Sequence, residues 1–148
     1  MGGLPEYDRY DALGLAELVR AGEVTPAELA EEAIRRAEAL QPVLNFLVTP
    51  LFERGRETAR GTLPDGPFRG VPFLLKDILQ DLAGVRTMAG SAAMEGFVPD
   101  RDAEVVRRFR EAGLVIVGKT SVPELGLMGV TEPEAFGATR NPWDLSRT

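Results

Sequence analysis

The sequence contains neither cysteine nor histidine. Without cysteine, the chain cannot form a disulfide, a thiolate nucleophile or a cysteine-ligated metal site. Without histidine, it lacks the side chain that serves most often as a general base and as a metal ligand. Any proton transfer carried out by these 148 residues therefore depends on lysine, aspartate, glutamate or tyrosine.

Positive charge is also scarce. Seventeen Lys and Arg residues against 23 Asp and Glu residues give a net charge of −6, and no block of basic residues is interleaved with aromatics. We therefore expect no direct nucleic-acid partner. No apolar run approaches the length of a membrane span, and residues 1–14 lack the basic and apolar segments of a secretory signal. These absences favour a cytoplasmic protein with no membrane partner.

About residues 8–60 are predicted to form a mostly helical front. "TPAE" at 25–28 combines a capping threonine, a proline suited to the first turn and a glutamate that completes a capping box. The apolar residues that follow recur on one helical face, and we expect this helix to end at Pro42. "LNFLV" at 44–48 indicates a short strand, and residues 51–60 indicate another helix.

Two buried strands with a helix between them are predicted in the second part of the chain, about residues 70–148. The strands are "VPFLLK" at 71–76 and "LVIVGK" at 114–119. The helix covers "AEVVRRFREAG" at 103–113, and Asp102 precedes it as the expected N-cap. Strand, helix and strand in this order predict a βαβ unit with parallel strands, so the fold class is α/β.

Lys76 ends the first of these strands, directly before Asp77. In one interpretation Lys76 is an ordinary strand end that reaches into water. In the other it stays partly buried, is hydrogen-bonded and works as a base. Adjacent side chains in a strand point to opposite faces, so Asp77 need not pair with Lys76. Lys119 ends the second strand in the same way, so the pattern alone does not distinguish the two interpretations.

Four motifs occur together in a fixed order. They are "GVPFLLKD" at 70–77, "TMAGSAAMEG" at 87–96, "DAEVVRRFREAGLVIVGKTSVPELG" at 102–126 and "AFGATRNPWDLSRT" at 135–148. In this combination the sequence resembles the amidase signature family, from about residue 8 to its last residue. The resemblance implies a mixed twisted sheet covered by helices.

The resemblance also implies a chemistry. In that family the lysine of the "KD" motif is the base of a Ser-Ser-Lys triad, and this role falls on Lys76. The base lysine must be neutral at working pH although a free lysine titrates near ~10.4, and apolar surroundings favour the neutral form. The expected reaction is hydrolysis of a small-molecule amide through an acyl-enzyme, with no metal and no organic cofactor. Lys119 has no catalytic counterpart in the family, and we expect it to be structural.

The two serines of the triad lie in a Gly/Ser-rich signature that begins just after "NPWD" in the family. The chain ends at Thr148, before that signature, and Ser91, Ser121 and Ser146 do not match its serines. We therefore expect residues 1–148 to be the N-terminal portion of a single amidase-like domain. Its main partner would be the remainder of that domain, and this chain alone would be inactive. Association into a homo-oligomer is left open.

Substrate contacts are expected in the segment "GLMGVTEPEAFG" at 126–137, with Gly126, Met128 and Thr131 as candidates for lining the pocket. An ordinary core position for Met128 is the alternative.

Two other functions are weighed. The glutaminase subunit of a tRNA-dependent amidotransferase shares the family motifs, but the segment after "GKT" departs from that subunit's usual "GKTN". A non-catalytic fragment, truncated or used only for interaction, would keep the scaffold without the nucleophile. We favour a free-standing amidase.

Overall fold

A computed structural model of the protein describes residues 6–148. Residues 1–5 lie outside the described residues, and with them part of the stretch at 1–14 for which no secretory signal is predicted. The helices are α1 (Ala12–Ala21), α2 (Pro26–Leu44), α3 (Phe52–Arg60) and α4 (Glu104–Glu111), and the strands are β1 (Leu47–Pro50), β2 (Pro72–Lys76) and β3 (Val115–Thr120). Short 3-10 turns lie at Tyr7–Arg9, Ala92–Met94 and Glu124–Gly126.

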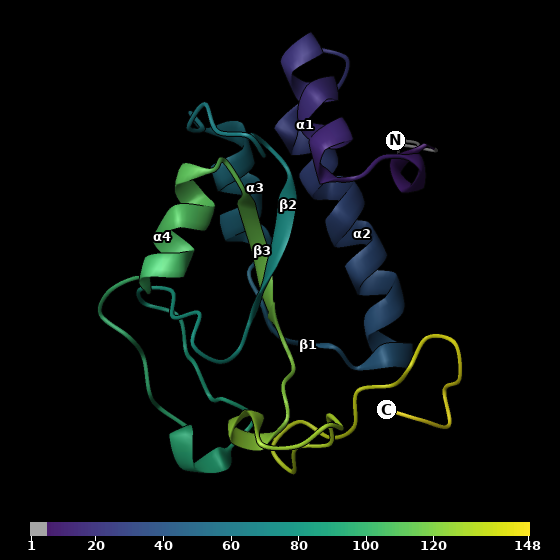
Figure 1. The fold of residues 1–148 in the computed structure, drawn as a ribbon, viewed down its shortest axis with the longest axis vertical. Helices are drawn as coiled ribbons and strands as arrows, with labels where there is room; N and C mark the ends of the chain where they lie inside the picture. The colour runs from purple at the N-terminus through teal and green to yellow at the C-terminus, as the bar shows by residue number, and fades with distance from the viewer. Residues whose placement is uncertain (1–5) are drawn as a thin grey trace.

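The strands form one mixed sheet in the order β1-β3-β2. β2 and β3 are parallel and are linked through α4, as the predicted βαβ unit requires, whereas β1 runs antiparallel to β3. In Figure 1, β2 and β3 lie side by side at the centre, with α2 on one side and α4 on the other. The chain thus has the mixed α/β fold expected from its sequence.

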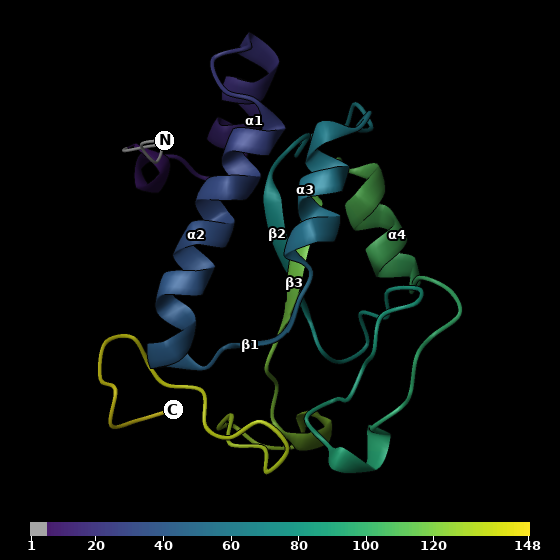
Figure 2. The ribbon, with the colours of Figure 1, turned by 180° about the vertical axis from the view of Figure 1, so that it is seen from behind.

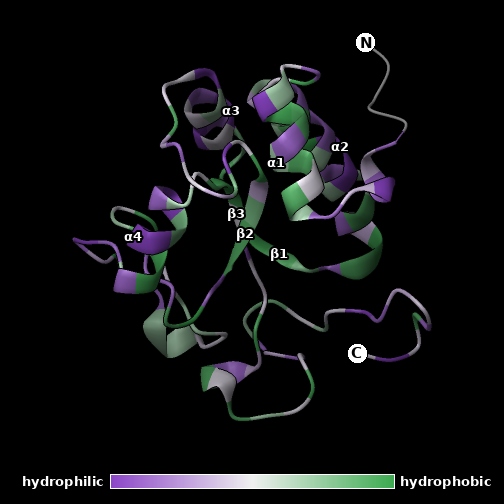
Figure 3. Ribbon diagram, turned by 45° about the horizontal axis from the view of Figure 1, so that its top comes forward, coloured by the Kyte–Doolittle hydropathy of each residue, from purple (hydrophilic) through white to green (hydrophobic). Residues whose placement is uncertain are grey.

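Helices cover both faces of the sheet. Apolar residues of α2, α3 and β3 form one buried cluster, which includes Ile34, Ala59 and Val115. On the other face, Leu75 and Ile116 pack against Val106 of α4. Figure 2 gives the view from behind, in which α3 lies in front of the strands. Figure 3 shows the strands mostly in the green of hydrophobic residues, whereas the helices mix hydrophobic and hydrophilic residues. Burial on both faces explains why these strands are apolar without alternation.

The predicted start of α2 is confirmed. Thr25 Oγ1 accepts a hydrogen bond from the backbone N–H of Glu28, and the Glu28 carboxylate accepts one from the backbone N–H of Thr25 at 2.8 Å. The predicted end at Pro42 is wrong, because α2 continues to Leu44. Pro42 is exposed and lies in the last turn, where the hydrogen bond that its missing N–H removes costs less than in the middle of a helix.

Because α2 extends beyond the predicted boundary, the strand expected at 44–48 begins later. β1 runs from Leu47 to Pro50, and residue 44 belongs to the helix. Asn45 adopts a left-handed conformation, with φ of 50°, and ends the helix. An asparagine tolerates this conformation better than most residues, so it is the physical stop signal here.

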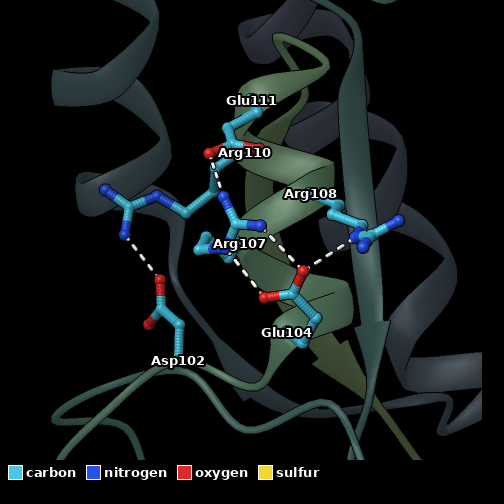
Figure 4. Close-up of polar contacts among 6 residues, drawn as sticks. All are labelled: Asp102, Glu104, Arg107, Arg108, Arg110 and Glu111. Atoms are coloured by element: carbon cyan, nitrogen blue, oxygen red, sulfur yellow. Dashed lines mark hydrogen bonds and ion pairs between the residues drawn. The ribbon is translucent and has the colours of Figure 1, made fainter.

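The prediction that Asp102 caps α4 is also wrong. Ala103 occupies the N-cap position, and Asp102 instead accepts a hydrogen bond from the backbone N–H of Ala83 at 2.8 Å and pairs with Arg110 at 2.7 Å. Figure 4 shows this pair beside a surface network in which Glu104 binds two arginines of α4. Asp102 therefore fastens the loop after β2 to α4.

Candidate functional site

The carboxyl ends of β2 and β3 lie next to each other. Lys76, the last residue of β2, pairs in register with Thr120, the last residue of β3. The long loops that follow both strands gather at the lower end of the molecule in Figures 1 and 2. This end of neighbouring parallel strands is a common position for binding and catalytic groups. These strand ends and their loops form the candidate site.

The structure exposes the side chain of Lys76. Its backbone N–H donates to Gln80 Oε1 at 2.7 Å, but within residues 6–148 its ammonium group has no hydrogen bond or ion pair. Within residues 6–148 the side chain of Lys76 thus lacks the partial burial expected in the second interpretation, and its role as a base stays a prediction. The ammonium group is open to a partner that residues 6–148 do not supply.

Lys119 lies in the opposite environment, with its side chain wholly buried. Its Nζ lies 2.8 Å from Asp77 Oδ1 and donates to Thr87 Oγ1 at 2.6 Å and to the carbonyl oxygen of Arg86 at 3.1 Å. Lys119 Nζ thus makes two hydrogen bonds and one ion pair, and Asp77 Oδ1 accepts no hydrogen bond in this geometry. This geometry agrees with the structural role predicted for Lys119.

A shift in the pairing of β2 with β3 explains why Asp77 meets Lys119. The register changes by one residue, so that Val117 has no partner and Leu75 pairs with Lys119. Paired side chains share a face of the sheet, and one extra residue turns all later side chains to the other face. Asp77, two residues beyond Leu75, lies on the face of Lys119, whereas Lys76 between them points to the opposite face.

The loop after β2 is bound to the end of that strand through Asp77. Asp77 Oδ2 accepts a hydrogen bond from the backbone N–H of Met88 at 3.0 Å, and the carbonyl oxygen of Asp77 accepts one from the N–H of Ala89 at 2.9 Å. Gly90 follows with φ of +71°, and a Cβ there would lie 2.7 Å from the carbonyl oxygen of Val122. Only glycine allows this close approach to the neighbouring loop.

The loops after β2 and β3 are joined by further hydrogen bonds. Ser91 Oγ donates to Glu124 Oε1 at 2.6 Å, and the backbone N–H of Leu125 donates to the carbonyl oxygen of Ala89 at 2.7 Å. Ser91 is buried. The "AGS" motif thus connects the two loops at the candidate site.

The three residues expected to line a substrate pocket follow this junction. Gly126 and Met128 are exposed, and Thr131 is half-buried, with its carbonyl oxygen bound to the N–H of Thr139 at 2.9 Å. With 64% of its surface exposed, Met128 is not a core residue of the described structure. A Cβ at Gly126 would lie 3.3 Å from Ile78, so this segment lies close to the residues that follow Lys76.

Two hollows in the surface lie away from these residues. One, of about 400 Å³, lies between α3 and α4 and is lined by Arg54, Leu114 and Arg107 among others. The other, of about 470 Å³, is lined by residues of α1, α2 and α3. Lys76 lines neither hollow.

Within residues 6–148, no group of three or more acidic side chains is placed to hold a metal ion. The same residues include no helix that is both long and apolar enough to cross a membrane.

Sequence reasoning missed the pairing of Asp77 with Lys119. The signal in the sequence was weak, because two apolar strands each end in a lysine and only one is followed by an acid. The one-residue shift in register that brings the two side chains together cannot be read from apolar runs.

Comparison with known proteins gives consistent results. The family model described as Amidase matches residues 28–148. The chain is 46% identical over 140 residues to the 6-aminohexanoate-cyclic-dimer hydrolase of Paenarthrobacter ureafaciens. This match covers 93% of this chain and 28% of that enzyme. It is 38% identical over 141 residues to a glutamyl-tRNA(Gln) amidotransferase subunit of Carboxydothermus hydrogenoformans, covering 90% of this chain and 29% of that relative.

Solved structures agree with these sequence matches. A structure of 6-aminohexanoate cyclic dimer hydrolase superimposes with a TM-score of 0.86 at 46% identity, over 92% of this chain and 28% of that one. A peptide amidase from Stenotrophomonas maltophilia superimposes with a TM-score of 0.81 at 33% identity, over 97% of this chain and 32% of that one. The chain therefore spans less than a third of the length of these curated relatives and structures.

Proposed function

The chain belongs to the amidase family, and from this premise we propose that it is the N-terminal part of an amidase-like domain that hydrolyses carboxamides. The helical front, about residues 8–60, and the βαβ-containing part, about residues 70–148, would belong to that one domain. The remainder of the domain is its expected partner. The amide would be converted to an acid and to ammonia or an amine, with no metal or organic cofactor.

In this proposal Lys76 is the base of a Ser-Ser-Lys triad whose serines lie outside these 148 residues. One serine attacks the amide carbonyl, and the second relays the proton between that serine and neutral Lys76. Lys76 later returns the proton to the leaving amine, and water clears the acyl-enzyme.

The contrast between the chain's two lysines supports Lys76 as the base. Lys119 is buried, and its Nζ donates hydrogen bonds to Thr87 and to the Arg86 carbonyl oxygen and forms an ion pair with Asp77. A buried Nζ with these partners is not open to a substrate or to a serine outside these residues. Lys76 ends its strand with an ammonium group that is free within residues 6–148.

The position of Asp77 also supports this role. A carboxylate beside the base would stabilise the protonated lysine and oppose proton abstraction. Asp77 instead lies on the other face of β2 and is paired with Lys119 at 2.8 Å. The negative charge of Asp77 is therefore balanced by Lys119, on the face of β2 opposite to Lys76.

The proposed substrate contacts are Gly126, Met128 and Thr131. They lie in the segment after β3, which the Ala89 carbonyl oxygen binds at Leu125. Exposed Met128 is suited to contact an apolar part of an amide, and exposed Gly126 leaves room beside Ile78. The remainder of the domain would close the pocket over these residues.

A second candidate is a glutaminase subunit of a tRNA-dependent amidotransferase, because a glutamyl-tRNA(Gln) amidotransferase subunit is among the relatives. Against it, "GKTS" at 118–121 departs from the "GKTN" of that subunit, and the cyclic-dimer hydrolase is more similar in sequence. A non-catalytic fragment remains the alternative from a different class.

The test compares two proteins on a panel of linear, cyclic and aryl amides and on glutamine, with release of amine or ammonia as the readout. We expect the 148-residue chain to be inactive, because it holds the base without its nucleophile. A longer protein that continues into a Gly/Ser-rich segment should be active, also in the presence of EDTA. Activity of the 148-residue chain, or an inactive but folded longer protein, would contradict the proposal.

A further inference from the structure

Asp77 and Lys119 lie at the junction of four segments: the ends of β2 and β3 and the two loops that follow them. Both side chains are at most 2% exposed. Their buried ion pair is therefore shielded from water and from salt, unlike the exposed pairs along α4. A buried ion pair is weak evidence for stability, and in some proteins such pairs serve to fix one geometry.

We propose that Asp77 and Lys119 are positioning residues that hold the substrate segment in place relative to the catalytic lysine. The inference rests on the proposed function for the identity of that segment and of the base. Neither residue touches the reacting atoms in this assignment. They act through the loop at 86–91.

Lys119 binds the start of that loop. Its Nζ donates to Thr87 Oγ1 at 2.6 Å and to the Arg86 carbonyl oxygen at 3.1 Å. These contacts fix the start of the loop to β3, although the loop follows β2 in the chain. Thr87 is itself buried, so no water can replace this bond without opening the loop.

Asp77 binds the middle of the same loop. Its carboxylate accepts from the N–H of Met88 at 3.0 Å, and its carbonyl oxygen accepts from the N–H of Ala89 at 2.9 Å. Asp77 is the neighbour of Lys76, and its own N–H donates to the Thr120 carbonyl oxygen at 3.1 Å. The same residue thus fixes both the strand end that carries Lys76 and the loop.

The loop in turn binds the substrate segment. The Ala89 carbonyl oxygen accepts from the N–H of Leu125 at 2.7 Å, and Ser91 Oγ donates to Glu124 at 2.6 Å. Leu125 directly precedes Gly126, the first of the proposed substrate contacts. Ala89 and Leu125 both adopt positive φ, of 50° and 52°, which these residue types hold only when neighbouring contacts enforce it.

Hydrogen exchange of the loop amides tests the inference without any enzyme assay. The variants are Lys119→Met, which removes the pair, and Thr87→Val, which keeps the ion pair and the bond to the Arg86 carbonyl oxygen but removes the side-chain bond between Lys119 and Thr87. Lys76→Met is the matched control, because it changes the only other lysine, at the end of the neighbouring strand. We expect exchange at Met88, Ala89 and Leu125 to rise about tenfold or more in both test variants, with α2 unchanged.

Unchanged exchange at these three amides in folded Thr87→Val would overturn the inference. If Lys119→Met fails to fold, Thr87→Val decides alone, since it leaves the ion pair intact. An equal rise in Lys76→Met would overturn it as well, because the effect would then belong to the strand ends in general.

Kinetics of the longer protein separate positioning from chemistry. For Thr87→Val we expect KM to rise about fivefold or more, with kcat within about twofold, because the base is untouched and the substrate segment is loosened. A fall in kcat at unchanged KM would contradict the positioning role. If the longer protein hydrolyses no amide, the proposed function fails, whereas the exchange result still tests the link from the pair to the loop.

Discussion

At the scale of single residues, the proposed chemistry depends on the different surroundings of two lysines. Both end apolar strands of the parallel pair, and the sequence pattern alone treats them alike. The structure buries Lys119 against Asp77 and exposes Lys76. A one-residue shift in the register of β2 and β3 produces this difference. The chemical environment of each lysine therefore follows from tertiary pairing, which local sequence does not encode.

This difference predicts selective chemical labelling. Mild reductive methylation of the native protein should modify Lys76 but not Lys119, because Lys119 Nζ is buried, donates two hydrogen bonds and is paired with Asp77. Mass spectrometry of the digested protein measures the modified fraction at each site. Denatured protein is the control and should be labelled at both lysines. Labelling of Lys119 in the native protein, at a rate similar to that of Lys76, would show that the buried pair does not exist in solution.

At the scale of elements, sequence reasoning succeeded where local chemistry dominates. The capping box of α2 depends on Thr25 and Glu28, three residues apart, and it is present. It failed where contacts between residues distant in sequence determine where an element begins or ends. Pro42 did not end α2, and Asp102 binds Ala83 and Arg110 instead of capping α4. Both failures lie at element ends, where exposure and partners distant in sequence determine the outcome.

A buried carboxylate in α2, that of Glu32, makes the free energy of unfolding depend on pH. Glu32 is buried, and its carboxylate binds Arg35 at 2.7 Å and Arg36 at 2.6 Å. The hydrogen bond from Arg35, followed by that from Arg36, lowers the pKa of Glu32 to about 2 from its usual 4.5, against the opposing effect of burial. A lowered pKa means that this stabilisation is complete above about pH 4.5 and is lost as the pH falls towards about 2.

We therefore expect Glu32→Gln to lower the free energy of unfolding by about 1–3 kcal/mol at pH 7, and by much less near pH 2.5. Denaturant melts at the two pH values measure the difference. The exposed Glu95→Gln serves as the matched control and should change stability little at either pH. An equal loss at both pH values would mean that Glu32 contributes by packing alone.

At the scale of the whole molecule, the sheet is small and open. It has three strands, and β1 and β2 are each paired on one side only within the described residues. Several large apolar side chains in the segments after β2 and β3 are exposed, including Leu79 at 82%, Leu127 at 77% and Trp143 at 95%. An open strand edge with exposed apolar residues nearby favours association.

The 148-residue chain should therefore be poorly stable or should associate when expressed alone. Each large side chain left uncovered forgoes roughly 1.5–3 kcal/mol of burial, which is large against a typical domain stability of about 5–15 kcal/mol. Light scattering, binding of an apolar dye and a thermal melt measure these properties. A monomer with a sharp transition and no dye binding would show that residues 1–148 form a closed domain, contrary to the proposal.

The most direct test of the central claim compares amide hydrolysis by the longer protein and by its Lys76→Arg variant. Arginine has a reach similar to that of lysine but stays protonated at working pH, so it cannot accept a proton. We expect kcat to fall roughly 10³-fold or more while the melting temperature changes little. The exposed Arg101→Ala variant is the control and should retain activity; Lys119 cannot serve, because breaking its buried pair costs about 3–5 kcal/mol. Near-parental turnover by folded Lys76→Arg would contradict the assignment of Lys76 as the base.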